Sequence, residues 1–281
     1  MPQVKTPKVG FEIEFNKISV KRTAEIIKSL FGGEIFKISK NKIEVKETEL
    51  GKFVVELDVG LVHKIAEHEN KLIPDDIVKL IDDNAEDVAG VIAPREIACP
   101  PVAESDIEKI DLLRKKLHQE GAQGTASSVL YAYGVHINPE VEEVSAKYIL
   151  AHIQSYIELV ESFDHETPID STRKLSGFIS KYPDAYQELV MDKSYNPDLN
   201  GLISDYLEYN PTRNRALDMT PLFKHLAPQM VDDVITDSKV KPRPTFHFRL
   251  PDCRIGDENW SIFAELDKWL RIRELAKMKM K

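Results

Sequence analysis

Hydrophobic and polar residues alternate in a short stretch near the N-terminus, Val9-Gly10-Phe11-Glu12-Ile13-Glu14-Phe15. A two-residue period is that of a β-strand, so the apolar side chains share one face and Glu12 and Glu14 share the other. These carboxylates lie about 6–7 Å apart on a strand, and they repel each other unless a cation or solvent lies between them. The pattern predicts either a half-exposed strand with solvated acids or one wall of a cation site.

The same alternation returns in segments far apart along the chain. Strands are predicted at 35–38, 42–46, 52–59, 91–101, 128–138 and 245–250. The polar faces of four of them carry Glu56 and Asp58, then Glu96, then His136 and Asn138, and finally His247 and Arg249. We therefore expect one sheet with helices on one face and an open, charged surface on the other.

Helical periodicity fills the intervals between the strands. Helices are predicted at 19–31, 75–83, 105–120, 144–163, 175–190, 202–207, 222–231 and 259–281. Ser105 and Glu108 have the spacing of a capping box at the start of the third helix. The whole pattern predicts an α+β fold in which residues 1–281 form a single domain, with a helical insertion at about 142–210.

Composition narrows the classes of function. The chain has 281 residues, 42% of them hydrophobic and 30% charged, which is ordinary for a globular protein with a sizeable core. Its net charge of −9 argues against nucleic-acid partners, which need a basic surface. No apolar run is long enough to span a membrane, and the N-terminus lacks the apolar core of a signal peptide. Cys99 and Cys253 make no disulfide framework, so we expect a cytoplasmic protein without a membrane partner.

The polar faces together indicate phosphoryl chemistry. Carboxylates with one or two imidazoles suit Mg²⁺ or Mn²⁺, and an arginine beside them suits a phosphate. The sequence contains neither a GxxxxGK[ST] loop nor a GxGxxG turn after a strand, so metals and arginines would have to hold the phosphates. Cys99 precedes Pro100-Pro101, and nothing marks it as an activated nucleophile.

Five short motifs, in order, resemble those of the amidoligase family, which is related to glutamine synthetase and glutamate-cysteine ligase. The matching segments are Gly10 to Phe15 (G-x-E-x-E-F), Glu96 to Pro101 (E-[LIV]-x-[SC]-P-P), Gly134 to Asn138 (G-[LV]-H-[IV]-[HN]), Arg213 to Asp218 (near R-x-R-A-L-N) and Thr245 to Arg249 (near T-[IF]-E-F-R). His247 stands where the family has glutamate, Asn138 where a second histidine is common, and Asp218 where asparagine is common.

The resemblance implies a curved, mainly antiparallel sheet shaped as half a barrel, with helices on one face. It implies an ATP-dependent carboxylate-amine ligase that forms an acyl phosphate on an amino acid or peptide substrate, with Mg²⁺ or Mn²⁺. The implied metal ligands are Glu12, Glu14, Glu96 and His136, joined by Glu56 or Asp58. Arg249, with Arg213 or Arg215, would bind the transferred phosphoryl group, and Asn138 and His247 would join Arg249 in binding the nucleotide.

Two other functions stay open at this point. His247 in place of the family glutamate is compatible with a catalytically weakened, nucleotide-binding or regulatory relative of the same fold. A phosphotransferase of the guanidino-kinase type would share a similar sheet but should carry a reactive cysteine, which neither Cys99 nor Cys253 resembles.

Overall fold

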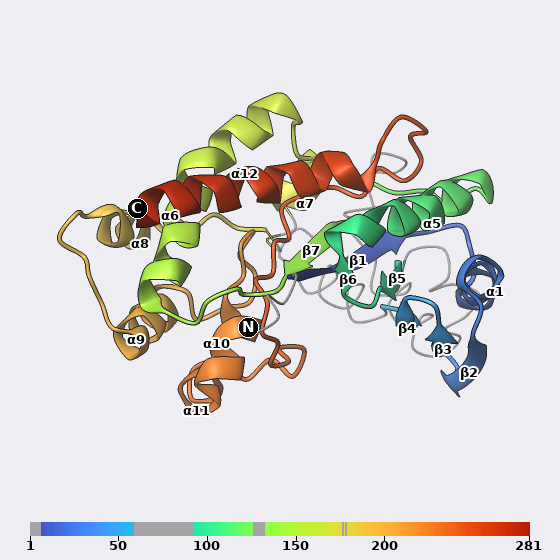
Figure 1. Ribbon diagram of the computed structural model, residues 1–281, viewed down its shortest axis with the longest axis horizontal. Helices are drawn as coiled ribbons and strands as arrows, with labels where there is room; N and C mark the ends of the chain where they lie inside the picture. The colour runs from blue at the N-terminus through green and yellow to red at the C-terminus, as the bar shows by residue number, and fades with distance from the viewer. Residues whose placement is uncertain (1–6, 59–92, 126–132, 176, 178) are drawn as a thin grey trace, which may run out of the picture.

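In the part of the chain that the structure describes, seven antiparallel strands form one open sheet in the order β2-β3-β4-β5-β1-β6, with β7 on the other edge of β1 (Figure 1). The computed structural model describes residues 7–58, 93–125, 133–175, 177 and 179–281. The strands are β1 (Lys8–Phe15), β2 (Glu34–Ser39), β3 (Lys42–Thr48), β4 (Gly51–Leu57), β5 (Arg95–Ala98), β6 (Val102–Ala103) and β7 (Val135–Pro139). The predicted helix at 75–83 lies outside the described residues, as do parts of the predicted strands 52–59, 91–101 and 128–138.

The segment around Phe248 pairs with β7 through isolated bridges and does not form another regular strand. Ile137 and Phe248 exchange backbone hydrogen bonds of 2.9 Å in each direction. On the other side of this extended segment, the Arg249 amide donates to Ala216 O at 2.7 Å and the Asp218 amide donates to His247 O at 2.9 Å. The predicted strand 245–250 is thus extended backbone held by isolated bridges, and it places His247 beside β7.

The helices are α1 (Val20–Phe31), α5 (Ile107–Gln119), α6 (Ala146–Glu166), α7 (Ser171–Leu175), α8 (Asp184–Met191), α9 (Leu199–Tyr209), α10 (Thr220–Leu226), α11 (Pro228–Asp232) and α12 (Ile262–Met280). Ser19 caps α1 by accepting from the Arg22 amide, and Gly32 ends it with φ 70°, a conformation that favours glycine. Helices α6 to α9 fall within the predicted helical insertion.

Three helix predictions need correction. Ser105 caps nothing: it lies within a 3₁₀ turn, Glu104–Asp106, that leads directly into α5. In the described part of the predicted helix 175–190, only the second half is helical: α7 ends at Leu175, and α8 begins after Pro183, which cannot continue a helix and stands at its N-cap. The predicted helix 222–231 divides at Pro228, the first residue of α11.

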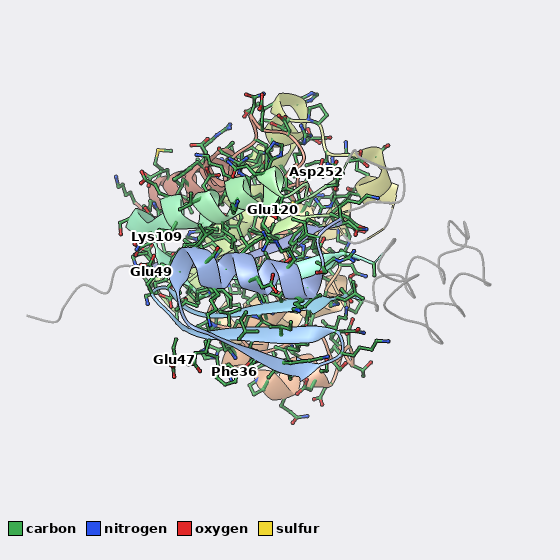
Figure 2. All side chains as sticks on the ribbon, turned by 90° about the vertical axis from the view of Figure 1, so that its right-hand side faces the viewer. Phe36, Glu47, Glu49, Lys109, Glu120 and Asp252 are labelled. Atoms are coloured by element: carbon green, nitrogen blue, oxygen red, sulfur yellow. The ribbon has the colours of Figure 1, made fainter. Side chains whose placement is uncertain are left out.

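One continuous cluster of buried side chains runs from Val9 to Ile272. The alternation in β1 delivers Phe11, Ile13 and Phe15 to it, as the sequence predicts. In α12, Trp269 packs against Phe246 with ring centroids 4.9 Å apart. Phe263 of the same helix is 43% exposed. The edge strand β2 also exposes an aromatic side chain, Phe36 (Figure 2).

The polar face of the sheet is covered at β1, in contrast to the expected open charged surface, whereas the side chain of Glu56 in β4 is 39% exposed. Glu12 is 7% exposed and Glu14 is 9% exposed. Figure 1 shows α5 and α12 above the sheet and α10 and α11 below it. The segment that follows α11 reaches the sheet through ion pairs to Glu12 and Asp58. Elements therefore lie on both faces of the sheet.

No helix of the described ranges combines the length and the apolar character that crossing a membrane requires. Cys99 and Cys253 are both buried and both free thiols.

Candidate functional site

A cavity of about 550 Å³ lies over the polar face of the sheet. Its acidic wall is built from strand residues and the residue after β4, and the facing basic wall comes from the last third of the chain. The acidic wall consists of Glu12, Glu14, Glu56, Asp58 and Glu96, and the basic wall consists of Arg213, Lys239, Lys241, Arg243 and Arg249. His136, His247, Asp218, Lys42 and Arg173 complete the charged and imidazole lining.

The strand register builds the acidic wall. Glu14 of β1 lies opposite Glu96 of β5, and Glu96 lies opposite Glu56 of β4. Residues directly opposite each other on a sheet have Cβ atoms about 5 Å apart, so these three carboxylates form a row across three strands. Lys42 of β3 extends the row, and its Nζ lies 2.8 Å from Glu56 Oε2.

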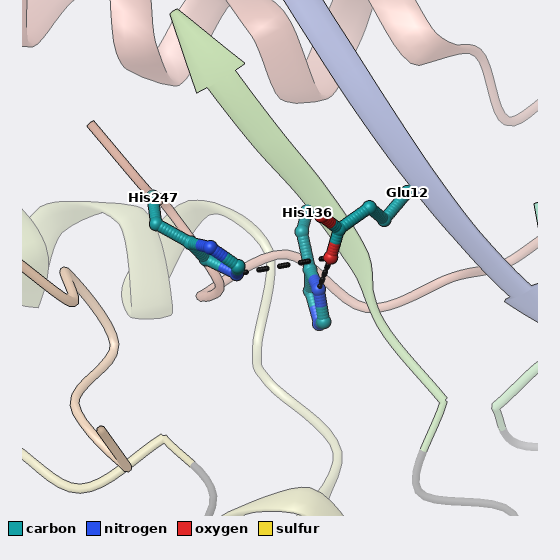
Figure 3. A group of neighbouring side chains, drawn as sticks. All are labelled: Glu12, His136 and His247. Atoms are coloured by element: carbon teal, nitrogen blue, oxygen red, sulfur yellow. Dashed lines mark hydrogen bonds and ion pairs between the residues drawn. The ribbon is translucent and has the colours of Figure 1, made fainter. Parts of the chain in front are cut away.

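Glu12, His136 and His247 form a tight cluster at one end of this wall (Figure 3). His136 Nδ1 is 2.9 Å from Glu12 Oε2, and His247 Nε2 is 3.9 Å from the same oxygen. One potential ligand atom from each residue lies within 4.8 Å of those from the other two. Asn138 donates to Glu12 Oε1 at 3.2 Å, which orients the carboxylate.

The cluster fits a divalent cation. Neither ring nitrogen of His247 has a hydrogen-bond partner among the described residues, although the side chain is buried. An unsatisfied buried polar group costs free energy, and a metal ion would satisfy it. Carboxylate oxygens and neutral imidazoles are ligands that Mn²⁺ accepts, whereas the all-carboxylate row of Glu14, Glu96 and Glu56 offers the oxygen ligands that Mg²⁺ prefers.

The pKa values of Glu96 and Glu12 are shifted in opposite directions. Removal from bulk water raises the pKa of Glu96 well above its ordinary value, and the surrounding carboxylates, Glu12 and Glu14 foremost, raise it further. Burial also acts to raise the pKa of Glu12, but His247, His136 and Arg243 outweigh it and hold that pKa well below its ordinary value. Without a bound cation, the negative charge of Glu96 is therefore less well compensated than that of Glu12.

The basic wall is held by the backbone around it. Arg249 Nη1 donates to Arg213 O at 2.9 Å and lies 3.8 Å from Asp218 Oδ2. Burial lowers the pKa of Arg249, although Asp218 opposes the effect, and an arginine keeps its charge at every physiological pH. Arg213 Nε donates to Asp237 Oδ2 at 2.8 Å.

Asp218 is the single described carboxylate placed within the basic side of the cavity. Its Oδ1 accepts from the amide and the hydroxyl of Thr220, at 2.9 and 2.7 Å. Burial raises the pKa of Asp218 to about 6, with Arg249 and the Thr220 hydrogen bonds acting against that rise.

Comparison with known families places the whole region from β1 to α12 in one family. A family model described as "Putative amidoligase enzyme" matches residues 5–271. The chain belongs to the amidoligase family. No curated protein and no solved structure matches it.

Most of the predicted site residues of this amidoligase line the cavity together, and two do not. Arg215 lies outside: its Nη1 donates to Lys181 O at 2.6 Å, so of the pair Arg213 and Arg215 only Arg213 faces the cavity. Asn138 stands behind Glu12 rather than at the cavity surface.

Sequence reasoning missed three basic residues of the amidoligase cavity, Lys239, Lys241 and Arg243. In the sequence these three cations alternate with Val240 and Pro242, shortly before the last predicted strand. Strand alternation aims side chains, but a proline-containing segment does not have that fixed period. The pattern therefore gave no reason to point these cations toward the acids.

Arg173 of α7 was also missed, and no local pattern marks it. Its guanidinium donates to the backbone carbonyls of Arg249, Leu250 and Pro251, each at 2.8 Å. Gly134 makes room for it, since a Cβ at that position would come within 2.6 Å of Arg173 Nη2. This contact gives the glycine of the G-V-H-I-N motif a physical reason.

Proposed function

We propose that this amidoligase is an ATP-dependent carboxylate-amine ligase that works through an acyl phosphate. One observation carries the proposal: a row of carboxylates with two imidazoles faces a wall of arginines and lysines across a single cavity. A polyphosphate bound with divalent cations matches both walls, because cations bridge it to the acids while guanidinium groups bind its free oxygens.

The residues that would hold the metal ions are Glu12, Glu14, Glu96 and His136, with His247, Glu56 and Asp58 within the same lining. Bound Mg²⁺ or Mn²⁺ neutralises phosphate oxygens and so favours attack at phosphorus. The chain's own part is to orient these ligands. Gly134 N donates to Glu14 Oε2 at 2.7 Å, and His136 and Asn138 fix Glu12.

Arg249 and Arg213 would bind the phosphoryl group as it is transferred, because their fixed positive charges stabilise developing negative charge. A carboxylate oxygen of the first substrate attacks the γ-phosphorus of ATP, the bond to the β-phosphate oxygen breaks, and ADP leaves. The nitrogen of the amine then attacks the acyl carbon and loses a proton, and inorganic phosphate leaves as the amide forms.

The proposal includes a glutamine synthetase-like arrangement of the sheet and a single domain across residues 1–281. We further propose an amino acid or peptide as substrate, chosen in part by the helical insertion. Arg173 of that insertion lines the cavity beside Arg249, which supports such a role.

A weakened nucleotide-binding relative is the second candidate, favoured by His247 at the position of the family glutamate. The imidazole supplies no negative charge, and burial lowers its pKa well below the ordinary value, against the opposing pull of Glu12. A relative of this kind would bind nucleotide with metal but would not transfer phosphate to a carboxylate.

Hydroxylamine tests the chemistry without knowledge of the amine. It intercepts acyl phosphates as hydroxamates, so only the carboxylate needs to be screened, with pooled amino acids and peptides in the presence of ATP and Mg²⁺. We expect hydroxamate in proportion to ADP with the wild type and none with Glu14→Gln. Nucleotide binding without hydroxamate from any pool would favour the weakened relative.

A further inference from the structure

Basic side chains of the segment 237–244, here called the basic strap, already lie on the candidate metal ligands. Arg243 pairs with Glu12 Oε1, an oxygen of the carboxylate that forms the Glu12–His136–His247 cluster. Lys239 Nζ lies 2.9 Å from both carboxylate oxygens of Asp58. The strap thus supplies positive charge at two positions where a metal ion would be expected.

The backbone of the strap is anchored at both ends. Asp237 accepts from Arg213 Nε and from the Lys239 amide, at 2.8 and 2.9 Å. At the other end, the Arg243 amide donates to Pro221 O at 3.0 Å, and Val240 between them is buried. Only the ends of the long side chains are free to change partners.

Both side chains keep room to move. The side chain of Arg243 is 38% exposed and that of Lys239 is 39% exposed, although both line the cavity. Long, partly solvated cationic side chains can move their charged ends while the backbone stays in place.

We propose that Arg243 and Lys239 are exchangeable counter-ions: they neutralise Glu12 and Asp58 when no metal is bound, and they move to phosphate oxygens when nucleotide arrives with its metal. This inference rests on the proposed function, because it assumes a metal–nucleotide ligand. The acids pass from a protein cation to a metal ion, and the released cations then face the new negative charge of the phosphates.

The exchange has a thermodynamic consequence of opposite sign for the two ligands. Arg243 competes with a metal ion that binds alone, so it lowers metal affinity in the absence of nucleotide. Once nucleotide is present, the positive charge of Arg243 favours binding of the nucleotide phosphates. Metal and nucleotide should therefore each strengthen the binding of the other.

The test measures Mn²⁺ binding alone, by calorimetry or by its paramagnetic signal, and then binding of a non-hydrolysable ATP analogue at saturating Mn²⁺. For Arg243→Gln we expect Mn²⁺ alone to bind about tenfold more tightly, because a positive charge has left the neighbourhood of Glu12. The analogue should bind about tenfold more weakly, because a phosphate contact has been lost.

Two matched variants guard the interpretation. Lys52→Gln removes a cation that pairs with Glu44 outside the cavity, and it should leave Mn²⁺ affinity unchanged. Arg243→Lys keeps the charge and should restore Mn²⁺ affinity to within a few-fold of the wild type. Thermal melting of each variant shows that the fold is intact.

Unchanged or weaker Mn²⁺ binding in Arg243→Gln would overturn the inference, and so would tighter Mn²⁺ binding with unchanged affinity for the analogue. A wild type that binds Mn²⁺ but no nucleotide would instead refute the proposed ligase function. The Mn²⁺ measurements would still decide whether Arg243 acts as a counter-ion.

Discussion

The acidic wall and the basic wall of the cavity are built by different means. Glu14, Glu96 and Glu56 lie on three neighbouring strands, and the pairing of those strands fixes the row. Lys239 and Arg243 lie on a segment without regular structure that is anchored by side-chain and backbone hydrogen bonds. The sheet sets the acidic wall, whereas Lys239 and Arg243 of the basic wall have partly exposed side chains on an anchored irregular segment.

The two kinds of construction suit two different tasks. Strand pairing fixes the backbone positions from which neighbouring carboxylates project, so a sheet suits ligands that a metal must meet at set positions. Flexible cations on an anchored segment can neutralise those carboxylates and then serve a different anion. The four predictions below test this contrast, from the largest expected effect to the smallest.

Loss of a carboxylate from the row should have the largest effect. In Glu96→Gln we expect the affinity for a non-hydrolysable ATP analogue with Mg²⁺ to fall about a hundredfold, because the proposed function makes Glu96 a ligand of the metal. Glu44→Gln is the control: Glu44 is an acid of the neighbouring strand β3, paired with Lys46 and Lys52 outside the cavity. Calorimetry that found equal losses in both variants would show that general charge, not the row, determines binding.

Loss of a buried arginine should come next. Arg249→Gln removes a charged hydrogen-bond donor from the cavity, and such a contact is worth about 1.5–3 kcal/mol. We expect analogue affinity to fall more than tenfold. Arg215→Gln removes another arginine that the family resemblance assigned to the site but that lies outside the cavity, and it should not change affinity. Equal effects in the two variants would contradict the placement of the basic wall.

The pH dependence of stability tests the acidic wall without any ligand. The pKa of Glu96 is raised in the folded protein, so this group favours folding fully below its unfolded pKa and loses that contribution as pH rises through the folded value. In EDTA, Glu96→Gln should remove this loss and raise the melting temperature by about 3 °C at neutral pH. Thermal melts across pH that showed Glu96→Gln to be less stable at neutral pH would mark Glu96 as structural.

The anchor of the basic strap should have the smallest effect. Asp237→Asn weakens the contact with Arg213, which is partly exposed, and such contacts contribute about 1 kcal/mol or less. We expect a loss of analogue affinity of a few-fold, with Mn²⁺ affinity unchanged. Calorimetric titrations of both ligands check this, and a loss as large as that of Arg249→Gln would mean that the anchor positions the whole wall.

The difference between the two walls also explains which residues of the site could be predicted from the sequence and which could not. Alternation located Glu12, Glu14, Glu56, Glu96, His136 and His247, because the period of a strand decides which face a side chain occupies. It could not show that 216–218 pairs with 247–249, since that contact depends on tertiary packing. It also could not show that the polar face is covered at β1, because Arg243 and Glu12 are far apart in the chain.

Helix predictions failed for local reasons. Ser105 and Glu108 have the residue types and the spacing of a capping box, but Ser105 lies in a 3₁₀ turn and does not cap the helix. Pro183 and Pro228 each begin a helix where a single continuous helix was expected. Hydrophobic periodicity can continue across a proline when the segments on both sides pack on the same core. A proline inside a predicted helix nevertheless indicates a break in that helix.

The most direct test of the central claim is a calorimetric titration of the wild type and Glu14→Gln with a non-hydrolysable ATP analogue, with and without Mn²⁺. We expect binding by the wild type that requires the metal and disappears in Glu14→Gln. Binding that does not depend on metal, or that survives in Glu14→Gln, would contradict the assignment of the acidic wall as the metal-dependent nucleotide site.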